Sequence, residues 1–292
     1  MISVIITAYN EPKTIGKAIY AFLNSSVENF EVICISPDEE TAKVVNQYSK
    51  LDSRVKYLKD PGAGKMFALH LAFEKAKGDI FVLTDGDVVC DSDAFVRILE
   101  PFVNPNVGCV AGMPVSANSK REIFGFWSHL LTFAAHKKRL SCARNGKYFT
   151  CSGYLFAFRN NVIESFPRDV PEDAYIPYKF LNEGYKLAYA PKAKIYVKYP
   201  LNFNEWVEQK RRIAKAYENY KNLGDLPMMK SFTNEILEGP LIALSFPGSL
   251  KEFYWTLLLF PARLYMWMLT FWDTRVAGNG HADGWKRIES TK

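Results

Sequence analysis

The stretch that decides the fold runs Asp79-Ile80-Phe81-Val82-Leu83-Thr84-Asp85-Gly86-Asp87. Its first part is a short, unbroken apolar run, which is typical of a strand buried on both faces of a sheet. Its last part sets two carboxylates on either side of a glycine, the residue that most easily accepts a tight turn. Because Asp-Gly is also a common turn dipeptide, this stretch alone leaves both an ordinary turn and a functional turn open.

Strands of this kind alternate with helices over residues 1–90. In Lys13–Leu23, apolar residues recur at the three- and four-residue spacing of a helix. Short strands that alternate with helices predict βαβ units, so the expected fold class is α/β with a mixed, mostly parallel sheet flanked by helices. The expected strands are Ser3–Ala8, Phe30–Ile35, Val55–Leu58 and Asp79–Leu83, and the expected helices are Lys13–Leu23, Thr41–Tyr48 and Lys65–Lys77.

Polar residues follow the ends of these strands, in Ala8-Tyr9-Asn10-Glu11, Ser36-Pro37-Asp38 and Asp85-Gly86-Asp87. Ligands of open α/β sheets bind in the crevice beyond the carboxyl ends of the strands, so we expect these segments to converge on one crevice. Carboxylate oxygens suit Mg²⁺ or Mn²⁺, which share their coordination with substrate phosphates. Asp85 and Asp87 are therefore candidate metal ligands.

The middle of the chain continues the mixed pattern. The helix expected at 173–182 ends before Gly184, a common stop signal, and the helix at 203–222 is amphipathic and strongly basic. The expected strands are Val107–Val115 and Tyr154–Phe158, and the expected helices are Ile123–Leu140, Asp173–Asn182 and Phe203–Asn222.

The character of the sequence changes near the C-terminus. Phe253–Trp272 is almost wholly apolar, with Arg263 as its only charge and Pro261 as an expected kink. About 20 apolar residues can span a bilayer, and Trp and Tyr near both ends fit interfacial belts. We therefore expect a membrane helix here, with the shorter apolar segment Glu235–Leu244 as an interfacial or re-entrant arm. A buried helix or a dimer interface is the alternative.

Composition narrows the classes of protein further. With 48% hydrophobic and 23% charged residues, the chain is neither disordered nor collagen-like. The net charge of +6 is compatible with an anionic membrane surface, a phosphorylated substrate or a nucleic acid, but no nucleic-acid-reading motif accompanies it. The five cysteines include no CxxC pair and the His residues no HExxH pair, which favours reduced thiols and no zinc site. The first residues read as a strand and not as a signal peptide.

Several motifs together resemble the family 2 glycosyltransferases, which have the GT-A fold. The segment 3–11 is similar to the opening of that family, and Gly64-Lys65 with the strand into Asp85-Gly86-Asp87 is similar to its donor-binding half. Pro171-Glu172-Asp173 resembles its acidic catalytic motif. Gln209-Lys210-Arg211-Arg212-Ile213 resembles the QxxRW motif of its cellulose-synthase-like members. The resemblance covers about residues 1–215, with the motifs in the family's order.

The resemblance implies a role for each matching position. Asp173 would be the catalytic base with Glu172 as the fallback, and Ser152 and Gly153 would form the floor of the acceptor pocket. Asp87 would be the main metal ligand, with Asp85 nearer the donor. The implied donor-binding residues are Ala8, Tyr9, Asn10, Glu11, Asp38, Lys65, Asp85, Gly86, Asp87, Gln209 and Arg212.

Ordinary explanations exist for several of these motifs. An acidic pair is favoured at any helix N-terminus, basic runs such as 210–215 are usually solvated, and Ser152-Gly153 could be a plain turn. The family's processive members have Trp where this chain has Ile213, and isoleucine offers no flat face on which a sugar ring can stack. This departure favours single sugar additions.

The resulting expectation is an inverting, Mg²⁺- or Mn²⁺-dependent glycosyltransferase at a membrane, with its catalytic domain facing the cytoplasm. The nucleotide-sugar donor is GDP-mannose by family habit, and the acceptor is a polyprenyl or dolichyl phosphate or a lipid-linked glycan. The alternatives are a processive polysaccharide synthase, a sugar-1-phosphate nucleotidyltransferase and a non-catalytic membrane scaffold; a nucleic-acid partner is not expected. The expected domains are a GT-A catalytic domain at 1–230, a membrane-associated hairpin at 231–273 and a polar basic tail at 274–292.

Overall fold

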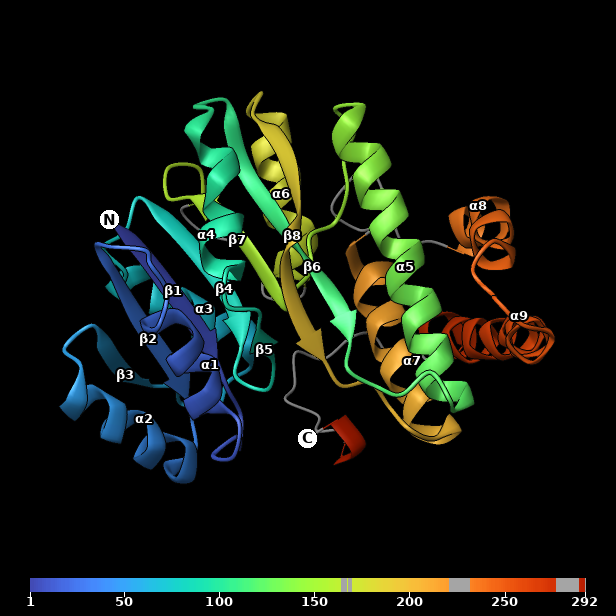
Figure 1. Ribbon diagram of the computed structural model, residues 1–292, viewed down its shortest axis with the longest axis horizontal. Helices are drawn as coiled ribbons and strands as arrows, with labels where there is room; N and C mark the ends of the chain where they lie inside the picture. The colour runs from blue at the N-terminus through green and yellow to red at the C-terminus, as the bar shows by residue number, and fades with distance from the viewer. Residues whose placement is uncertain (164–166, 168–169, 221–231, 277–288, 292) are drawn as a thin grey trace.

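A computed structural model describes residues 1–163, 167, 170–220, 232–276 and 289–291. The core is one eight-stranded sheet with the strand order β3-β2-β1-β4-β7-β6-β8-β5, flanked by helices (Figure 1). The strands are β1 (Ile2–Thr7), β2 (Phe30–Ser36), β3 (Val55–Lys59), β4 (Ile80–Asp85), β5 (Val89–Cys90), β6 (Val107–Ser116), β7 (Leu155–Arg159) and β8 (Lys186–Val197). The helices are α1 (Ile15–Leu23), α2 (Glu39–Leu51), α3 (Lys65–Lys75), α4 (Ala94–Leu99), α5 (Ile123–Arg144), α6 (Glu172–Asn182), α7 (Phe203–Tyr220), α8 (Phe232–Leu244) and α9 (Leu250–Phe271).

The N-terminal half confirms the expected parallel βαβ arrangement. β1 pairs in parallel with β2 and β4, and β2 pairs in parallel with β3. Val4 and Ile6 on β1 pack with α1 and α4 on one face of the sheet, whereas Ile5 packs with α3 and α6 on the other. Because successive side chains point to opposite faces, a strand covered on both sides must be apolar throughout. This is why β1, β2 and β4 are mostly apolar in sequence, with Ser3 and Glu31 as buried polar residues that hydrogen-bond to each other.

The C-terminal half makes the sheet mixed. β7 is antiparallel to both β4 and β6, and β8 is parallel to β6 but antiparallel to β5. No sequence pattern predicted β5, α4 or β8. In β8, exposed lysines such as Lys192 and Lys194 alternate with buried residues such as Ala193 and Ile195, so no unbroken apolar run marks it. The mixed sheet with helices on both faces fits the GT-A fold.

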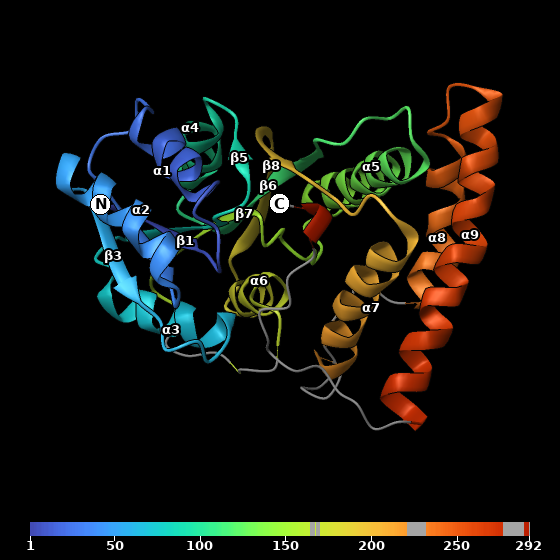
Figure 2. The same cartoon turned by 90° about the horizontal axis from the view of Figure 1, so that it is seen from below.

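Beside the sheet, α5, α7, α8 and α9 form a separate hydrophobic cluster (Figure 2). Leu259, Met266 and Trp267 of α9 are buried in it, together with Trp127 of α5 and Trp206 of α7. The indole N–H of Trp127 donates to the carbonyl of residue 255 at 2.7 Å. One face of α9 is therefore a protein-packing face.

The expectation of a membrane-spanning helix at 253–272 is not supported. Among the described residues, no helix has the length and apolarity needed to cross a membrane. The apolar run coincides with α9, but its Arg263 forms an ion pair with Glu235 of α8, and the indole N–H of Trp267 donates to the same carboxylate at 2.9 Å. The aromatic residues that suggested interfacial belts thus partly serve contacts between helices.

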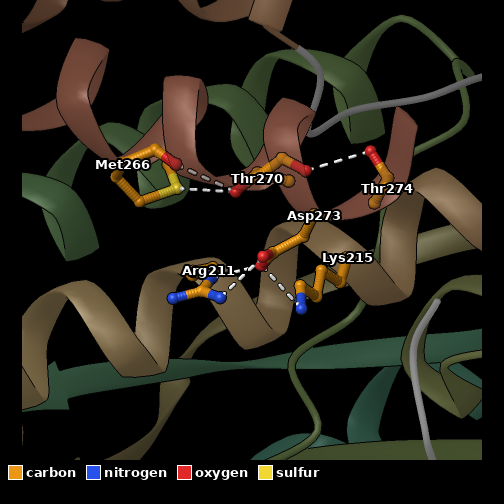
Figure 3. A network of polar contacts seen from close by, with 6 residues as sticks. All are labelled: Arg211, Lys215, Met266, Thr270, Asp273 and Thr274. Carbon is orange, nitrogen blue, oxygen red and sulfur yellow. Dashed lines mark hydrogen bonds and ion pairs between the residues drawn. The ribbon is translucent and has the colours of Figure 1, made fainter. Parts of the chain in front are cut away.

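The end of α9 is tied to α7 by a cluster of charges (Figure 3). Asp273 lies in the short π-helix η3 (Trp272–Val276) and is buried. Its carboxylate accepts hydrogen bonds from Arg211 and forms an ion pair with Lys215, whose Nζ lies 2.6 Å from Oδ2 of Asp273. These two residues of the basic run at 210–215 therefore have a carboxylate partner. The expected domain boundary near residue 230, the last residues of the helix expected at 203–222 and most of the expected tail lie outside the described residues.

Candidate functional site

The carboxyl ends of β1 and β4 open into a cavity of about 650 Å³. Its wall includes Thr7 and Asp85 at these strand ends, the N-terminal end of α6, one face of α7 and parts of α5, α8 and α9. The predicted site residues that line it are Tyr9, Glu11, Lys65, Asp85, Asp87, Ser152, Gly153, Glu172, Asp173, Gln209 and Arg212.

Lys65, at the start of α3, connects the two acidic segments of the cavity. Its Nζ lies 2.8 Å from Oδ1 of Asp85 and 2.7 Å from Oε1 of Glu172. Burial alone would lower the pKa of Lys65, but the two carboxylates raise it well above its ordinary value, so the side chain stays charged. Burial also raises the pKa of the Glu172 carboxyl, with the charge of Lys65 acting against this rise. The ammonium group thus holds the β4 turn and the start of α6 at a fixed separation.

The turn after β4 is shaped by close packing around Gly86. A Cβ on Gly86 would lie 2.8 Å from both Cβ of Ala8 and Oε2 of Glu11, so no larger residue fits without displacement. Ala8 is buried beneath the cavity and, like Gly86, is absent from its wall. Both residues therefore shape the site from below its wall. Their contact with a nucleotide stays a prediction.

Asp38 and Asn10 lie beside the cavity and not on its wall. The carboxylate of Asp38 accepts hydrogen bonds from the backbone N–H of Thr41 at 2.8 Å, which caps α2, and from the backbone N–H of Asn10 at 2.7 Å. Asn10 has a φ of 55°, and the bond to Asp38 stabilises this left-handed conformation. The predicted donor contacts of these two residues also stay predictions.

Asp173 is held through both its main chain and its side chain. The N–H of Cys151 donates to the carbonyl of Asp173 at 2.8 Å, and the phenol of Tyr217 donates to its Oδ1 at 3.3 Å. Tyr217 lies on α7, is 3% exposed and also bonds the hydroxyl of Thr150. Burial, reinforced by the carboxylate of Asp173, raises the pKa of this phenol well above its ordinary value, so it stays a donor.

Arg212 and the β4 turn approach each other around Tyr154. Burial is the main cause that raises the pKa of this phenol well above its ordinary value. The charges of Asp85 and Asp87 raise it further, whereas the charge of Arg212 acts in the opposite direction. All of these groups line the cavity, so the structure places the strand-end carboxylates and the arginine of α7 in one cavity.

The carboxylates of the β4 turn can supply only part of the ligand set of a metal ion. No group of three or more His, Cys, Asp or Glu side chains in the described ranges could hold a metal ion by itself. Oδ1 of Asp85 accepts hydrogen bonds from Lys65 at 2.8 Å and Thr7 at 3.0 Å, and Asp87 lines the same cavity from the same turn, so both carboxylates stay candidate ligands. Because Mg²⁺ is commonly held by one or two carboxylates together with substrate phosphates, this pair fits such an ion when a diphosphate is present.

Comparison with known proteins agrees with this geometry. Residues 1–216 match the family described as Glycosyltransferase like family 2. The chain belongs to that family. The family 2 match ends within α7, just after Arg212, so α8 and α9 lie outside it.

Curated family 2 relatives are similar at low identity. The chain is 24% identical over 231 residues to a probable glycosyltransferase of Bacillus subtilis, covering 74% of this chain and 54% of the relative. It is 24% identical over 239 residues to an N-acetylglucosaminyltransferase of Azorhizobium caulinodans, covering 74% and 59%. It is 25% identical over 227 residues to a poly-beta-1,6-N-acetyl-D-glucosamine synthase of Staphylococcus aureus, covering 74% and 54%. The chain thus spans a little over half the length of these relatives, and its family supports the expectation of a transferase enzyme.

A solved structure confirms the fold of the family 2 region. The crystal structure of a mycobacterial protein matches with a TM-score of 0.51 and 14% identity, over 78% of this chain and 76% of that one.

Several residues that line the cavity were not predicted from the sequence. Thr7, Tyr154, Arg139 and Tyr217 carry no motif of their own, and only the position of Tyr217 five residues after Arg212, on the same helix, could have marked it.

Proposed function

We propose that this protein is an inverting glycosyltransferase that moves a sugar from a nucleotide diphosphate sugar to an acceptor hydroxyl. The observation that carries the proposal is the single cavity in which the Asp85-Gly86-Asp87 turn, the bridging Lys65 and the carboxylate of Asp173 meet. A donor diphosphate and an acceptor hydroxyl can enter such a cavity together, which is the requirement for direct transfer.

The chemistry follows from the placement of the charges. Asp173 accepts the proton of the acceptor hydroxyl, whose oxygen attacks the anomeric carbon. The bond from that carbon to the diphosphate oxygen breaks, and the nucleoside diphosphate leaves with the bonding electrons. Because the attack and the departure take place on opposite faces, the configuration of the anomeric carbon is inverted. Arg212 and other cations of the cavity stabilise the charge that develops on the leaving group. When bound at Asp87 and Asp85, Mg²⁺ or Mn²⁺ would supply further neutralisation of the diphosphate.

The donor sugar is proposed from the relatives. Two of them are named for N-acetylglucosamine, which favours this sugar over the GDP-mannose expected from family habit. Single addition remains our proposal over processive synthesis, because Ile213 packs with Val170, Ala174 and Tyr217 and leaves no aromatic platform at its position. A role as a nucleotidyltransferase or as a non-catalytic scaffold has no observation of its own in its favour.

A membrane surface is the proposed location. The outer faces of α8 and α9 and the start of η3 expose apolar side chains, including Leu241 at 78%, Met268 at 62% and Trp272 at 62%. Exposed apolar surface on this scale marks an interaction site, and an interfacial hairpin would bury it without spanning the bilayer. The basic chain would then face the anionic cytoplasmic leaflet, and the acceptor would be lipid-linked or a glycan held near that surface.

The test is turnover of the purified protein with Mn²⁺ against a panel of UDP- and GDP-sugars. The expected result is release of one nucleoside diphosphate and loss of at least about a hundredfold in kcat for Asp173→Asn, since general-base catalysis contributes on this scale. Glu183→Gln is the matched control, because Glu183 is an exposed carboxylate at the other end of α6. Equal activity of Asp173→Asn and the wild type would refute the assignment of the base.

A further inference from the structure

Arg139 of α5 is a buried cation that forms no ion pair with the residues that the structure describes. Its side chain lines the cavity, yet the residue is only 3% exposed. Nε donates to the carbonyl of Thr150 at 2.9 Å and Nη2 to the carbonyl of Cys151 at 3.0 Å. Nη1 has no hydrogen-bond partner among the described residues. One edge of the guanidinium group is therefore anchored to the protein, and Nη1 at the other edge has no partner in the described part of the chain.

Other cations on the same cavity wall are compensated. Lys65 pairs with Asp85 and Glu172, Lys138 pairs with Glu238, and Arg263 pairs with Glu235. Arg139 has no carboxylate within ion-pair distance in the described part of the chain. A buried charge without a partner is unfavourable, so such groups are kept where a ligand supplies the opposite charge. Arginine is also the side chain best shaped to bind a phosphate through two parallel hydrogen bonds.

Three helices add apolar residues to the cavity wall. These residues are Leu131, Ala134 and Ala135 of α5, Ile242 and Ala243 of α8, and Leu259 and Phe260 of α9. The same helices contribute the ion pairs Lys138–Glu238 and Arg263–Glu235, whose charges compensate each other. The residues of α8 and α9 lie outside the region that matches the family. A hydrocarbon chain can bury its surface against these apolar side chains.

Arg139 is connected to Asp173 through the backbone of Cys151. The carbonyl of Cys151 accepts from Arg139, and the N–H of the same residue donates to the carbonyl of Asp173. We propose that Arg139 binds a phosphate group of the acceptor and that the hydrocarbon chain of the acceptor lies between α5, α8 and α9. The phosphate then stands between the chain and the hydroxyl that is glycosylated. This inference rests on the proposed function, because it assigns the acceptor of the same site.

The test compares an anionic amphiphile with its neutral counterpart. Farnesyl phosphate and farnesol have the same chain and differ only in the phosphate, so their affinities for the full chain isolate the contribution of the anion. Calorimetry should show wild type binding farnesyl phosphate at least about tenfold more tightly than farnesol, as expected for one charge-assisted contact. Arg139→Gln should abolish this difference, whereas Arg144→Gln, an exposed arginine on the last turn of α5, should retain it. Equal affinity of wild type for the two amphiphiles would overturn the proposal.

A second variant keeps the test valid if Arg139→Gln fails to fold. Ala134→Phe narrows the apolar part of the cavity and leaves the contacts of Arg139 unchanged, so it should weaken both amphiphiles about tenfold. Unchanged affinity in this variant would place the chain elsewhere and refute the lipid part of the proposal. Inorganic pyrophosphate serves as a competitor that has no hydrocarbon chain. If pyrophosphate displaced farnesyl phosphate at equal concentration, the site would be a general phosphate site, and the acceptor proposal would be contradicted.

The acceptor proposal can fail independently of the proposed function. Binding of UDP or GDP with Mn²⁺ reports on the donor half of the cavity and should be the same in wild type and Arg139→Gln. If the nucleotides bind and transfer occurs, but farnesyl phosphate and farnesol bind equally, only the acceptor assignment is wrong. If no nucleotide diphosphate binds to the wild type, the proposed function itself is wrong.

Discussion

Replacing Lys65 by methionine should destabilise the protein in a way that depends on pH. Methionine keeps most of the side-chain volume but leaves Asp85 and Glu172, whose oxygens lie 2.8 and 2.7 Å from Nζ, without their shared cation. Breaking a fully buried ion pair costs about 3–5 kcal/mol. Because the side chain of Lys65 is 24% exposed, water offsets part of this, and we expect a loss of about 2–3 kcal/mol near neutral pH.

The sign of the pH dependence follows from Glu172. Burial raises the pKa of this carboxyl above its value in the unfolded chain, and Lys65 acts against the rise, so its removal should raise the pKa further. A group with a raised pKa favours the folded state at low pH, and this contribution is lost as the pH rises through the folded pKa. Protonated Glu172 requires no cation. The loss of unfolding free energy in Lys65→Met relative to wild type should therefore be smaller at low pH and grow as the pH rises.

Urea unfolding at several pH values between 5 and 8 measures this deficit directly. Lys75→Met is the matched control, since Lys75 is exposed at the other end of α3 and its replacement should change the free energy of unfolding by less than about 0.5 kcal/mol. The double variant Lys65→Met with Glu172→Gln should recover part of the loss at pH 8. A deficit that is constant across the pH range, or that the double variant does not reduce, would refute the bridging role of Lys65.

Further predictions concern the base, the sheet and the α7–α9 contact. Tyr217→Phe removes the hydrogen bond to Asp173 and should move the acidic limb of the kcat/KM profile to higher pH, with Tyr178→Phe on α6 as a control that leaves the profile in place. Glu31 accepts hydrogen bonds from Ser3 at 2.7 Å, from Lys56 at 2.6 Å and from the backbone N–H of Lys77. Burial alone would raise the pKa of Glu31, but these hydrogen bonds lower it below its ordinary value. Glu31→Gln should therefore lose about 2 kcal/mol at pH 7 in urea unfolding, and the difference from wild type should shrink as the pH falls through the lowered pKa; a difference independent of pH would contradict this. Asp273→Asn should lower the midpoint of thermal unfolding by weakening the contact of Asp273 with Arg211 and Lys215, and an unchanged midpoint would show that this contact contributes nothing.

The elements of the fold that could be predicted from the sequence are those with a simple hydrophobic pattern. Strands β1, β2 and β4 are covered on both faces, so most of their residues are apolar, and the strand-end rule then placed the Asp85-Gly86-Asp87 turn at the crevice. Strand β8 was missed because only one of its faces is buried for much of its length and lysines occupy the other. The Gly64-Lys65 motif marked Lys65, but its ion pairs with Asp85 and Glu172 join elements that meet only in the folded chain. The same holds for the contacts of Tyr217 and Arg139, and no local sequence pattern reports on them.

The interpretation of α9 shows why composition alone misleads. Counted by residue type, 253–272 resembles a membrane helix, and a count cannot tell which side of the helix each residue occupies. In the structure, Leu259 and Phe260 line the cavity and Met266 is fully buried, whereas Tyr254, Met268 and Trp272 are exposed. Apolar side chains on both sides of one helix are needed if one side receives the chain of a lipid and the other rests on the membrane that supplies it. The proposed acceptor site and the proposed membrane surface therefore account together for an apolar content that a helix with a single buried face would not need.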